Sequence, residues 1–245
     1  MPDSYETTEL LNQYLLFHYG TPSEVLHKGW DWPAGMREAL NFPVRTVGYF
    51  GRNEVERALD LGCAVGRSTF ELARAASKVI GIDYSARFIE AARVLATGVA
   101  LDYSRLEEGR IRTPLAAVAP AGIHLPRVTF QQGDAMALPE DLGAFDRVHA
   151  ANLLCRLREP LELLQRLGSL VKPGGELVLA TPGTWLEEFT PPENWPTGTT
   201  LEWLEETLED DFELERCHEE PFLIRETARK FQWSRSLVSL WRKRA

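Results

Sequence analysis

A short apolar run that ends in a glycine turn, ALDLGCAVG at 58–66, constrains the fold of this chain more than any other feature. Further apolar runs of strand-like length follow it, and segments with helical spacing separate them. The expected strands cover 58–62, 78–83, 127–134, 145–154 and 175–182, and the expected helices cover 68–76, 86–96 and 160–171. Strands that alternate with helices form βαβ units, with a parallel sheet and helices on both faces. The sequence therefore predicts an α/β fold.

A segment of helix and loop precedes this core. Apolar and aromatic residues recur at helical spacing within 6–20, and Thr7 or the next threonine can cap that helix. The glycine, proline and tryptophan content of 20–42 is typical of a loop with apolar anchors. We expect residues 1–56 to cover the active site and residues 57–245 to form the main domain.

Two segments interrupt the alternation of strands and helices. Residues 98–127 are a long insertion, and loops of that length are usually functional or mobile. Residues 183–200 are aromatic, acidic and proline-rich, and they follow a strand whose carboxyl end is where open α/β sheets bind ligands. We expect a substrate-binding loop there. After a helix over 201–208, the runs 212–226 and 230–243 fit an antiparallel pair at the sheet edge.

Composition excludes several classes of partner. The net charge of -9 and the pI of about 5.2 disfavour binding to a nucleic-acid backbone. No apolar run reaches the roughly 18 residues of a membrane helix, and the first ten residues do not resemble a secretion signal. The three cysteines are far apart and odd in number, which favours a reducing cytoplasm, and no Cys/His cluster has metal-ligand spacing. We therefore expect a cytoplasmic protein without a metal centre.

The glycine turn is the first candidate ligand site. Gly62 and Gly66 allow a close approach of the backbone to a ligand, although the same turn also occurs without one. A dinucleotide is disfavoured, because Asp60 would repel a pyrophosphate. The same carboxylate suits a ligand with an ammonium and a sulfonium group.

Two more carboxylates follow expected strands. Asp83 ends the second strand, where an acidic residue can accept hydrogen bonds from both hydroxyls of a ribose. It can equally be the N-cap of the next helix. Asp134 ends the third strand, where its carboxylate can accept a hydrogen bond from an exocyclic amine. Both predictions place polar groups at one edge of the sheet.

Together, LDLGCAVG, VIGIDYS, GDAMALP, FDRVHAANLL and LVKPGGELVLATP resemble the class I S-adenosylmethionine (SAM)-dependent methyltransferases, in order and spacing. One departure is Ala64, where many members have a third glycine. The resemblance implies a Rossmann-like sheet of seven strands with an antiparallel last strand, and SAM as methyl donor with S-adenosylhomocysteine as product. It also implies Asp83 on the ribose and Asp134 near the adenine amine. The cofactor-binding residues that follow are Asp60, Gly62, Cys63, Gly66, Asp83, Tyr84, Asp134, Ala135 and Asn152.

The flanking strings resemble a narrower group. YETTELLNQYLLFHYG, NFPVR, TWLEEFTPPENW and PFLIRETARKFQWS are similar to the C-terminal methyltransferase domain of the ovothiol biosynthesis enzyme, a mercaptohistidine N-methyltransferase. This resemblance implies methylation of an imidazole ring nitrogen of 5-thiohistidine, or of 5-selenohistidine in the selenium pathway. We expect a stand-alone enzyme, functionally coupled to a separate sulfoxide or selenoxide synthase. Its partner would be a small amino acid, with neither nucleic acid nor membrane involved.

Candidate substrate contacts are polar or aromatic residues in these flanks. The set is Tyr14, His18, Tyr19, Trp185, Glu188, Phe189, Arg225 and Arg229. Asn152, His18 and Tyr14 are the candidate catalytic residues. Arg225 is our choice for the substrate carboxylate, because an arginine binds carboxylates bidentately. Each has a plainer alternative: a packed helix, a capping asparagine, a loop that packs on its tryptophans, or surface charge. Arg156 fits a solvated helix residue.

The alternatives for function remain open at this point. The chain could be another small-molecule N-, O- or S-methyltransferase, or a catalytically silent SAM-binding subunit. A dinucleotide oxidoreductase is a further alternative. No nucleophile elbow and no H-E-x-x-H motif is present, as expected for methyl transfer, which requires neither a covalent intermediate nor a metal.

Overall fold

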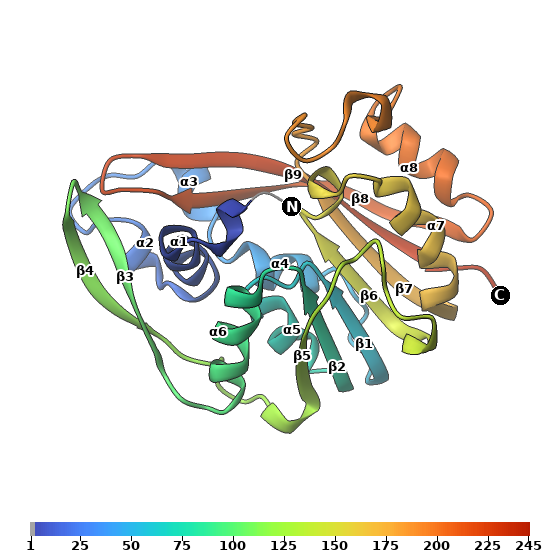
Figure 1. Ribbon diagram of the computed structural model, residues 1–245, viewed down its shortest axis with the longest axis horizontal. Coiled ribbons are helices and arrows are strands. Elements are labelled where there is room, and N and C mark those ends of the chain that lie inside the picture. Colours follow the sequence, from blue (N-terminus) through green and yellow to red (C-terminus); the bar gives the residue numbers. More distant parts are fainter. Residues whose placement is uncertain (1–2) are drawn as a thin grey trace.

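A seven-stranded sheet forms the centre of the computed structural model, which describes residues 3–245 (Figure 1). The strand order is β5-β2-β1-β6-β7-β9-β8. The strands are β1 (Val55–Leu61), β2 (Ala76–Asp83), β5 (Val128–Gln132), β6 (Phe145–Ala151), β7 (Val171–Thr181), β8 (Phe212–Arg225) and β9 (Phe231–Lys243). The first five are parallel, and β9 runs antiparallel to both β7 and β8. The predicted Rossmann-like methyltransferase fold is confirmed.

Helices cover both faces of this sheet because its central strands are apolar on both sides. Helices α5 (Arg67–Leu72) and α6 (Ala86–Ala96) pack on one face with Phe70 and Phe88 buried. Helices α7 (Pro160–Leu170) and α8 (Thr200–Leu208) cover the other face, where Trp241 is buried. Near-continuous apolar strands are typical of a parallel sheet covered on both faces. The sheet is therefore the rigid support of everything at its carboxyl edge.

The N-terminal segment folds over that carboxyl edge. It contains η1 (Asp3–Glu6), α1 (Thr8–Tyr19), α2 (Pro22–Val25), α3 (Ala34–Glu38) and α4 (Phe42–Val47), which we call the cap helices. The Thr7 side chain accepts a hydrogen bond from the Leu10 amide at 3.3 Å, so the predicted N-cap is confirmed. Residues 20–42 are not only loop as predicted, because α2 and α3 lie within them.

The insertion at 98–127 is a β-hairpin and not a long loop, which corrects the prediction. Strand β3 (Leu101–Glu108) pairs antiparallel with β4 (Ile111–Ala117), and Gly109 turns between them with φ 55°. The outer ends of β8 and β9 extend beyond the sheet and over α1 towards this hairpin (Figure 1). The Ala228 amide, between β8 and β9, donates to the Glu107 carbonyl at 3.0 Å. The two hairpins and the cap helices therefore form one lobe.

Smaller features complete the fold. Short 3-10 turns lie at η2 (Leu125–Arg127), η3 (Glu140–Leu142), η4 (Leu154–Arg156) and η5 (Pro192–Asn194). Residues 172–175 form an irregular start of β7, where the register with β6 shifts. Within residues 3–245, no helix combines the length and the apolar character needed to cross a bilayer.

Candidate active site

A cavity of about 630 Å³ lies between the carboxyl edge of the sheet and the cap helices. Its size falls within the roughly 300–1,000 Å³ of small-molecule sites. The lining comes from the loop after β1, the ends of β2 and β6, the loop after β7, helices α1 and α4, and strands β8 and β9. The sheet with its loops and the lobe of hairpins and cap helices therefore both contribute to one site.

The loop after β1 needs residues that accept left-handed backbone. Gly62 and Gly66 have φ values of 68° and 89°, and Ala64 between them has φ 48°. A Cβ at Gly66 would lie 2.6 Å from the Phe130 ring, so only glycine fits there. Ala64 is the position where the resemblance expects a glycine, and an L-residue adopts this conformation at a cost of about 1–2 kcal/mol. The loop is held tightly enough to keep that strain.

Asp60, near the end of β1, holds the loop after β1 in place through hydrogen bonds. One carboxylate oxygen accepts hydrogen bonds from Ser68 Oγ at 2.7 Å and Thr69 Oγ1 at 2.6 Å. The other oxygen lies 2.7 Å from His149 Nδ1, and His149 Nε2 lies 3.0 Å from Thr46 Oγ1 in α4. Asp60 is 1% exposed and does not line the cavity, whereas His149 does. The buried chain Asp60–His149–Thr46 ties the cofactor loop to the cap helices.

Asp83 is the carboxylate that faces the cavity. Its oxygens accept hydrogen bonds from the Ala64 amide at 2.8 Å and the Ser85 amide at 2.9 Å. Burial raises the pKa of Asp83 to about 6, although these two N–H donors oppose the shift. Each oxygen keeps a lone pair for a ligand hydroxyl. The N-cap alternative does not apply, because the Ser85 side chain caps α6.

Asn152 lies where β6 ends and also lines the cavity. Its backbone has φ 56°, and its Oδ1 accepts a hydrogen bond from Ser236 Oγ of β9 at 2.7 Å. The left-handed backbone aims the residue away from the strand, and asparagine tolerates that conformation better than most residues. Because Oδ1 is engaged by Ser236, the Nδ2 donor is left to face a ligand.

The cap side of the cavity is aromatic. Tyr14 and Phe88 have ring centroids 4.8 Å apart, and Tyr5 lies 6.2 Å from Phe189. The His18 ring centroid lies 5.3 Å from that of Phe17, and His18 is buried. Its Nδ1 has no hydrogen-bond partner among the residues that the structure describes. Burial lowers the pKa of His18 to about 3, so its imidazole is neutral at pH 7. A buried polar group without a partner is costly, which indicates that a ligand supplies one.

Arg156 belongs to the cavity and not to the solvated surface. It lies in η4, lines the cavity, and its guanidinium sits 4.7 Å above the Phe189 ring. Sequence reasoning also missed His149, Gln13 and Ser68, which line the cavity. The one available signal was His149, a polar residue in the middle of an apolar strand.

The structure brings only part of the predicted site residues to the cavity. Those that line it are Gly62, Asp83, Tyr84, Asn152, Tyr14, His18, Glu188 and Phe189. Several cofactor candidates lie behind or beside this lining: Asp60, Cys63, Gly66, Asp134 and Ala135. Asp134 instead accepts a hydrogen bond from the Met136 amide at 2.9 Å. Their predicted contacts with the cofactor stay predictions.

Tyr19 and Trp185, predicted as substrate contacts, do not line the cavity either. The Tyr19 hydroxyl donates to the Val65 carbonyl at 2.7 Å, which fastens α1 to the loop after β1. Trp185 packs edge-on against Trp203 of α8, with ring centroids 5.9 Å apart. Both aromatic residues therefore support the site from outside, because their polar or apolar surface is already used.

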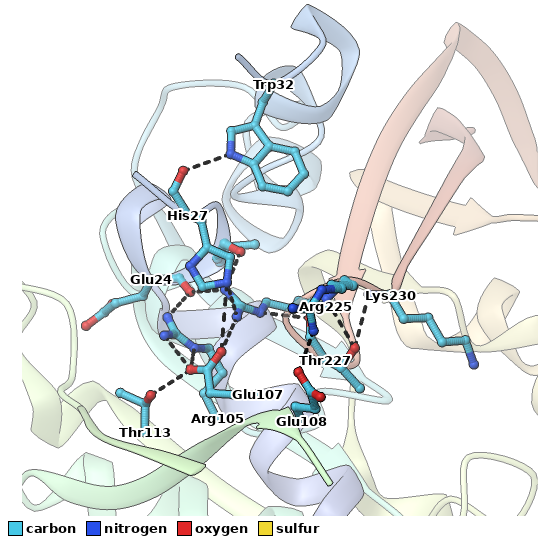
Figure 2. A network of polar contacts seen from close by, with 12 residues as sticks. Glu24, His27, Trp32, Arg105, Glu107, Glu108, Thr113, Arg225, Thr227 and Lys230 are labelled. Atoms are coloured by element: carbon cyan, nitrogen blue, oxygen red, sulfur yellow. Dashed lines mark hydrogen bonds and ion pairs between the residues drawn. The ribbon is translucent and has the colours of Figure 1, made fainter. Parts of the chain in front are cut away.

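The predicted carboxylate-binding role of Arg225 is wrong, because no donor of its guanidinium is free. Nε donates to the Thr227 carbonyl, and Nη1 donates to the carbonyls of Glu24 and Val25. Nη2 contacts Glu107 at 2.6 Å and His27 Nε2 at 3.0 Å. Figure 2 shows Arg225 within this network, among residues of α2 and β3 and of the turn that follows β8.

Arg229, the other predicted arginine, points to solvent. Its side chain is 78% exposed and pairs with Glu108 across the hairpin ends. Neither it nor Arg225 lines the cavity. The cationic cluster around 225–230 thus joins the two hairpins and does not form an anion pocket. Among residues 3–245 there is also no group of three or more His, Cys, Asp or Glu that could hold a metal ion.

Comparisons with known proteins agree with this architecture. Residues 53–236 match the family described as "Methyltransferase domain", and the chain belongs to that family. The ubiquinone biosynthesis O-methyltransferase of Xanthomonas euvesicatoria pv. vesicatoria is 31% identical over 62% of this chain and 54% of its own length. The first curated relatives are matched over 30–60% of their length.

Solved structures share the fold at lower identity. The [4+2]-cyclase SpnF aligns with a TM-score of 0.59 and 19% identity, over 98% of this chain and 97% of its own. A TehB-like SAM-dependent methyltransferase from Corynebacterium glutamicum aligns with a TM-score of 0.50 and 20% identity, over 82% of this chain and 87% of its own. Identities this low establish the fold alone.

SAM is the methyl donor of this family, and the residues present fit it. Asp83 offers a buried carboxylate to a ribose. Gly62 places no side chain between the backbone of the loop and the cavity. A Cβ at this position would also lie only 3.1 Å from the Leu153 side chain. The chain is therefore a SAM-dependent methyltransferase domain.

Proposed function

We propose that this protein transfers the methyl group of SAM to an imidazole ring nitrogen of 5-thiohistidine or of 5-selenohistidine. The observation that supports this acceptor most directly is the buried His18 imidazole beside Tyr14 and Phe17, whose Nδ1 has no hydrogen-bond partner among the described residues. Flat aromatic side chains can stack on the planar imidazole of the acceptor. The unpartnered nitrogen of His18 can accept a hydrogen bond from an N–H group of that imidazole. The similarity of the flanking strings to the ovothiol methyltransferase domain points to the same acceptor.

SAM supplies an electrophilic methyl group on a sulfonium, so the chain has mainly to align the attacking nitrogen with it. We infer that Asp83, Gly62, Tyr84 and Asn152 hold the cofactor at the carboxyl edge of the sheet. Asp60, Cys63 and Gly66 keep the loop after β1 in shape, and Asp134, which follows β5, stays the predicted contact of the adenine amine. Glu188 and Phe189 of the loop after β7 close the acceptor side.

His18 is the proposed positioning residue for the acceptor ring. An imidazole with a pKa of about 3 holds a proton poorly, so His18 is not a strong base. Its neutral ring can instead accept a hydrogen bond from one ring N–H of the substrate. That bond selects the tautomer in which the other nitrogen has a free lone pair. The acidic thiol or selenol of the substrate lowers the need for a protein base.

The biological setting follows from this acceptor. A separate sulfoxide or selenoxide synthase would supply the thio- or selenohistidine. The three cysteines are free in the structure, which fits a reducing compartment such as the cytoplasm. Residues 1–56 would then be the lid-like part of the domain, and 57–245 the catalytic part.

The test is mass spectrometry of SAM reactions with histidine, 5-thiohistidine and 5-selenohistidine. We expect one methyl group on the thiol or selenol compounds and little on histidine, because a site built to pair a polar group rejects the analogue that lacks it. Comparable kcat/KM for histidine would contradict the proposal in favour of a general histidine methyltransferase. Tight S-adenosylhomocysteine binding without turnover of any acceptor would indicate a silent SAM-binding subunit.

A further inference from the structure

We propose that Arg156 is the carboxylate-binding residue of the acceptor subsite, so that the acceptor is an amino acid bound through its α-carboxylate. This inference rests on the proposed function and deepens it, because it names the group other than the ring that the site recognises. It also replaces Arg225, whose five donors are occupied elsewhere.

The guanidinium of Arg156 is anchored on one edge by backbone carbonyls, and within the described residues no ion pair with a carboxylate uses the other edge. Nη1 donates to the Cys155 carbonyl at 2.9 Å and to the Thr184 carbonyl at 3.1 Å. Nη2 reaches the Thr184 hydroxyl only at 3.5 Å, and no carbonyl or carboxylate contacts Nε or Nη2 within the described part of the chain. Nε and Nη2 form the edge that binds a carboxylate with two parallel hydrogen bonds. The anchored edge fixes the direction of that fork.

Charge in the cavity favours the same assignment. Among the described residues that line it, Arg156 is the one arginine, and no lysine is present. Asp83 and Glu188 are the lining carboxylates, and Asp83 belongs to the cofactor side. A carboxylate that enters this cavity therefore has one permanent cation to meet, and Glu188 remains for an ammonium group.

The surroundings of Arg156 strengthen its attraction for an anion. Phe189 covers one face of the guanidinium at 4.7 Å, which removes water from that side. Arg156 also donates a hydrogen bond to the Tyr5 hydroxyl, and burial raises the pKa of Tyr5, so this phenol stays neutral and does not cancel the charge of Arg156. Arg156 thus lies beside the aromatic surfaces that would contact the substrate ring.

The experiment compares 5-thiohistidine with its decarboxylated analogue, 5-thiohistamine, in the wild type, Arg156→Gln and Arg156→Lys. Arg158→Gln is the matched control, because Arg158 is exposed and does not line the cavity. Loss of a charge-assisted fork should raise the KM for 5-thiohistidine about 10- to 100-fold. Arg156→Lys should recover only part of this loss, because an ammonium cannot form the fork. KM for 5-thiohistamine should be high in the wild type and nearly unchanged by the substitutions.

Three results would overturn the inference. If the wild type uses both acceptors equally well, no carboxylate subsite exists, although the proposed function stands. If Arg156→Gln weakens S-adenosylhomocysteine binding by calorimetry as much as it raises the acceptor KM, the carboxylate belongs to the cofactor. If the wild type methylates neither compound, the proposed function itself fails and this inference fails with it. Arg156→Lys, checked by thermal melting, keeps the test decisive should Arg156→Gln not fold.

Discussion

The cofactor side and the acceptor side of the cavity are built in different ways. Asp83, Gly62 and Asn152 come from the ends of adjacent parallel strands, and short backbone hydrogen bonds hold them in place. The acceptor side combines α1, the loop after β7 and the hairpin of β8 and β9, which are far apart in the sequence. The cofactor side thus depends on the sheet, whereas the acceptor side depends on how the lobe of hairpins and cap helices assembles.

This difference shows where a change of substrate can arise. Replacing residues on the cofactor side disturbs the sheet edge and the strained loop with Ala64. Replacing aromatic or charged residues on the acceptor side leaves the sheet intact. The buried chain Asp60–His149–Thr46 is the link between the two, because it joins the loop after β1 to α4.

The largest effect should come from removing the buried arginine that holds the lobe together. Arg225→Ala removes one of the two arginine partners of Glu107, the other being Arg105, and leaves the Glu24 and Val25 carbonyls of α2 without this donor. Breaking a buried pair in this way should lower the free energy of unfolding by about 3–5 kcal/mol, measured by urea denaturation. Arg229→Ala is the control, because its exposed pair with Glu108 should contribute less than about 1 kcal/mol. Equal effects of the two substitutions would mean that Arg225 does not hold the lobe.

On the cofactor side, Asp83→Ala should weaken S-adenosylhomocysteine binding by at least roughly tenfold. The reason is the loss of charge-assisted hydrogen bonds to the ribose, which contribute about 1.5–3 kcal/mol. Isothermal titration calorimetry measures this directly. The acceptor-side variant His18→Asn should bind S-adenosylhomocysteine as the wild type does, and unchanged affinity in Asp83→Ala would remove Asp83 from the site.

Acid should act on the cofactor side through the same carboxyl. With a pKa raised to about 6 by burial, Asp83 becomes protonated as the pH falls from 7 to 5 and loses the negative charge that the ribose hydroxyls meet. S-adenosylhomocysteine affinity should therefore fall by up to about tenfold over this range. Calorimetry at several pH values tests it. In Asp83→Asn the decline should disappear, and an identical decline in that variant would assign it to another group.

On the acceptor side, His18→Asn should lower kcat/KM for 5-thiohistidine by about tenfold, the value of one neutral hydrogen bond. The pH profile of this variant should not gain or lose an ionisation between pH 5 and 8, because His18 is neutral throughout that range. Steady-state kinetics at several pH values separates this positioning role from general-base catalysis. If the wild type loses kcat/KM as the pH falls below roughly 6.5 and the variant does not, His18 would be a general base instead.

Sequence reasoning predicted the sheet, its helices and the cavity-facing Asp83 because all of these depend on local patterns. In βαβ units, strand, turn and helix follow one another at regular intervals along the chain. Each recognised motif therefore indicates where the next one lies. The cap helices and the insertion were less predictable, since 98–127 became a hairpin through pairing that no short window encodes.

The roles of the arginines could not be predicted for a related reason. Arg225 is 118 residues from Glu107 and 201 residues from Glu24, so its partners are invisible along the chain. Arg156 was predicted to be a solvated helix residue, but it lines the cavity. Both residues are arginines, so the residue type does not decide whether the guanidinium forms a buried ion pair, as in Arg225, or faces the cavity, as in Arg156. The tertiary arrangement decides it.

The central claim is that both sides of the cavity serve methyl transfer to a ring nitrogen of a thio- or selenohistidine. The most direct measurement is NMR of the product formed from SAM with an isotopically labelled methyl group and 5-thiohistidine. We predict that the label appears on one imidazole nitrogen, with correlations to ring protons or carbons. Label on the sulfur, or no transfer by a protein that binds S-adenosylhomocysteine, would contradict the claim.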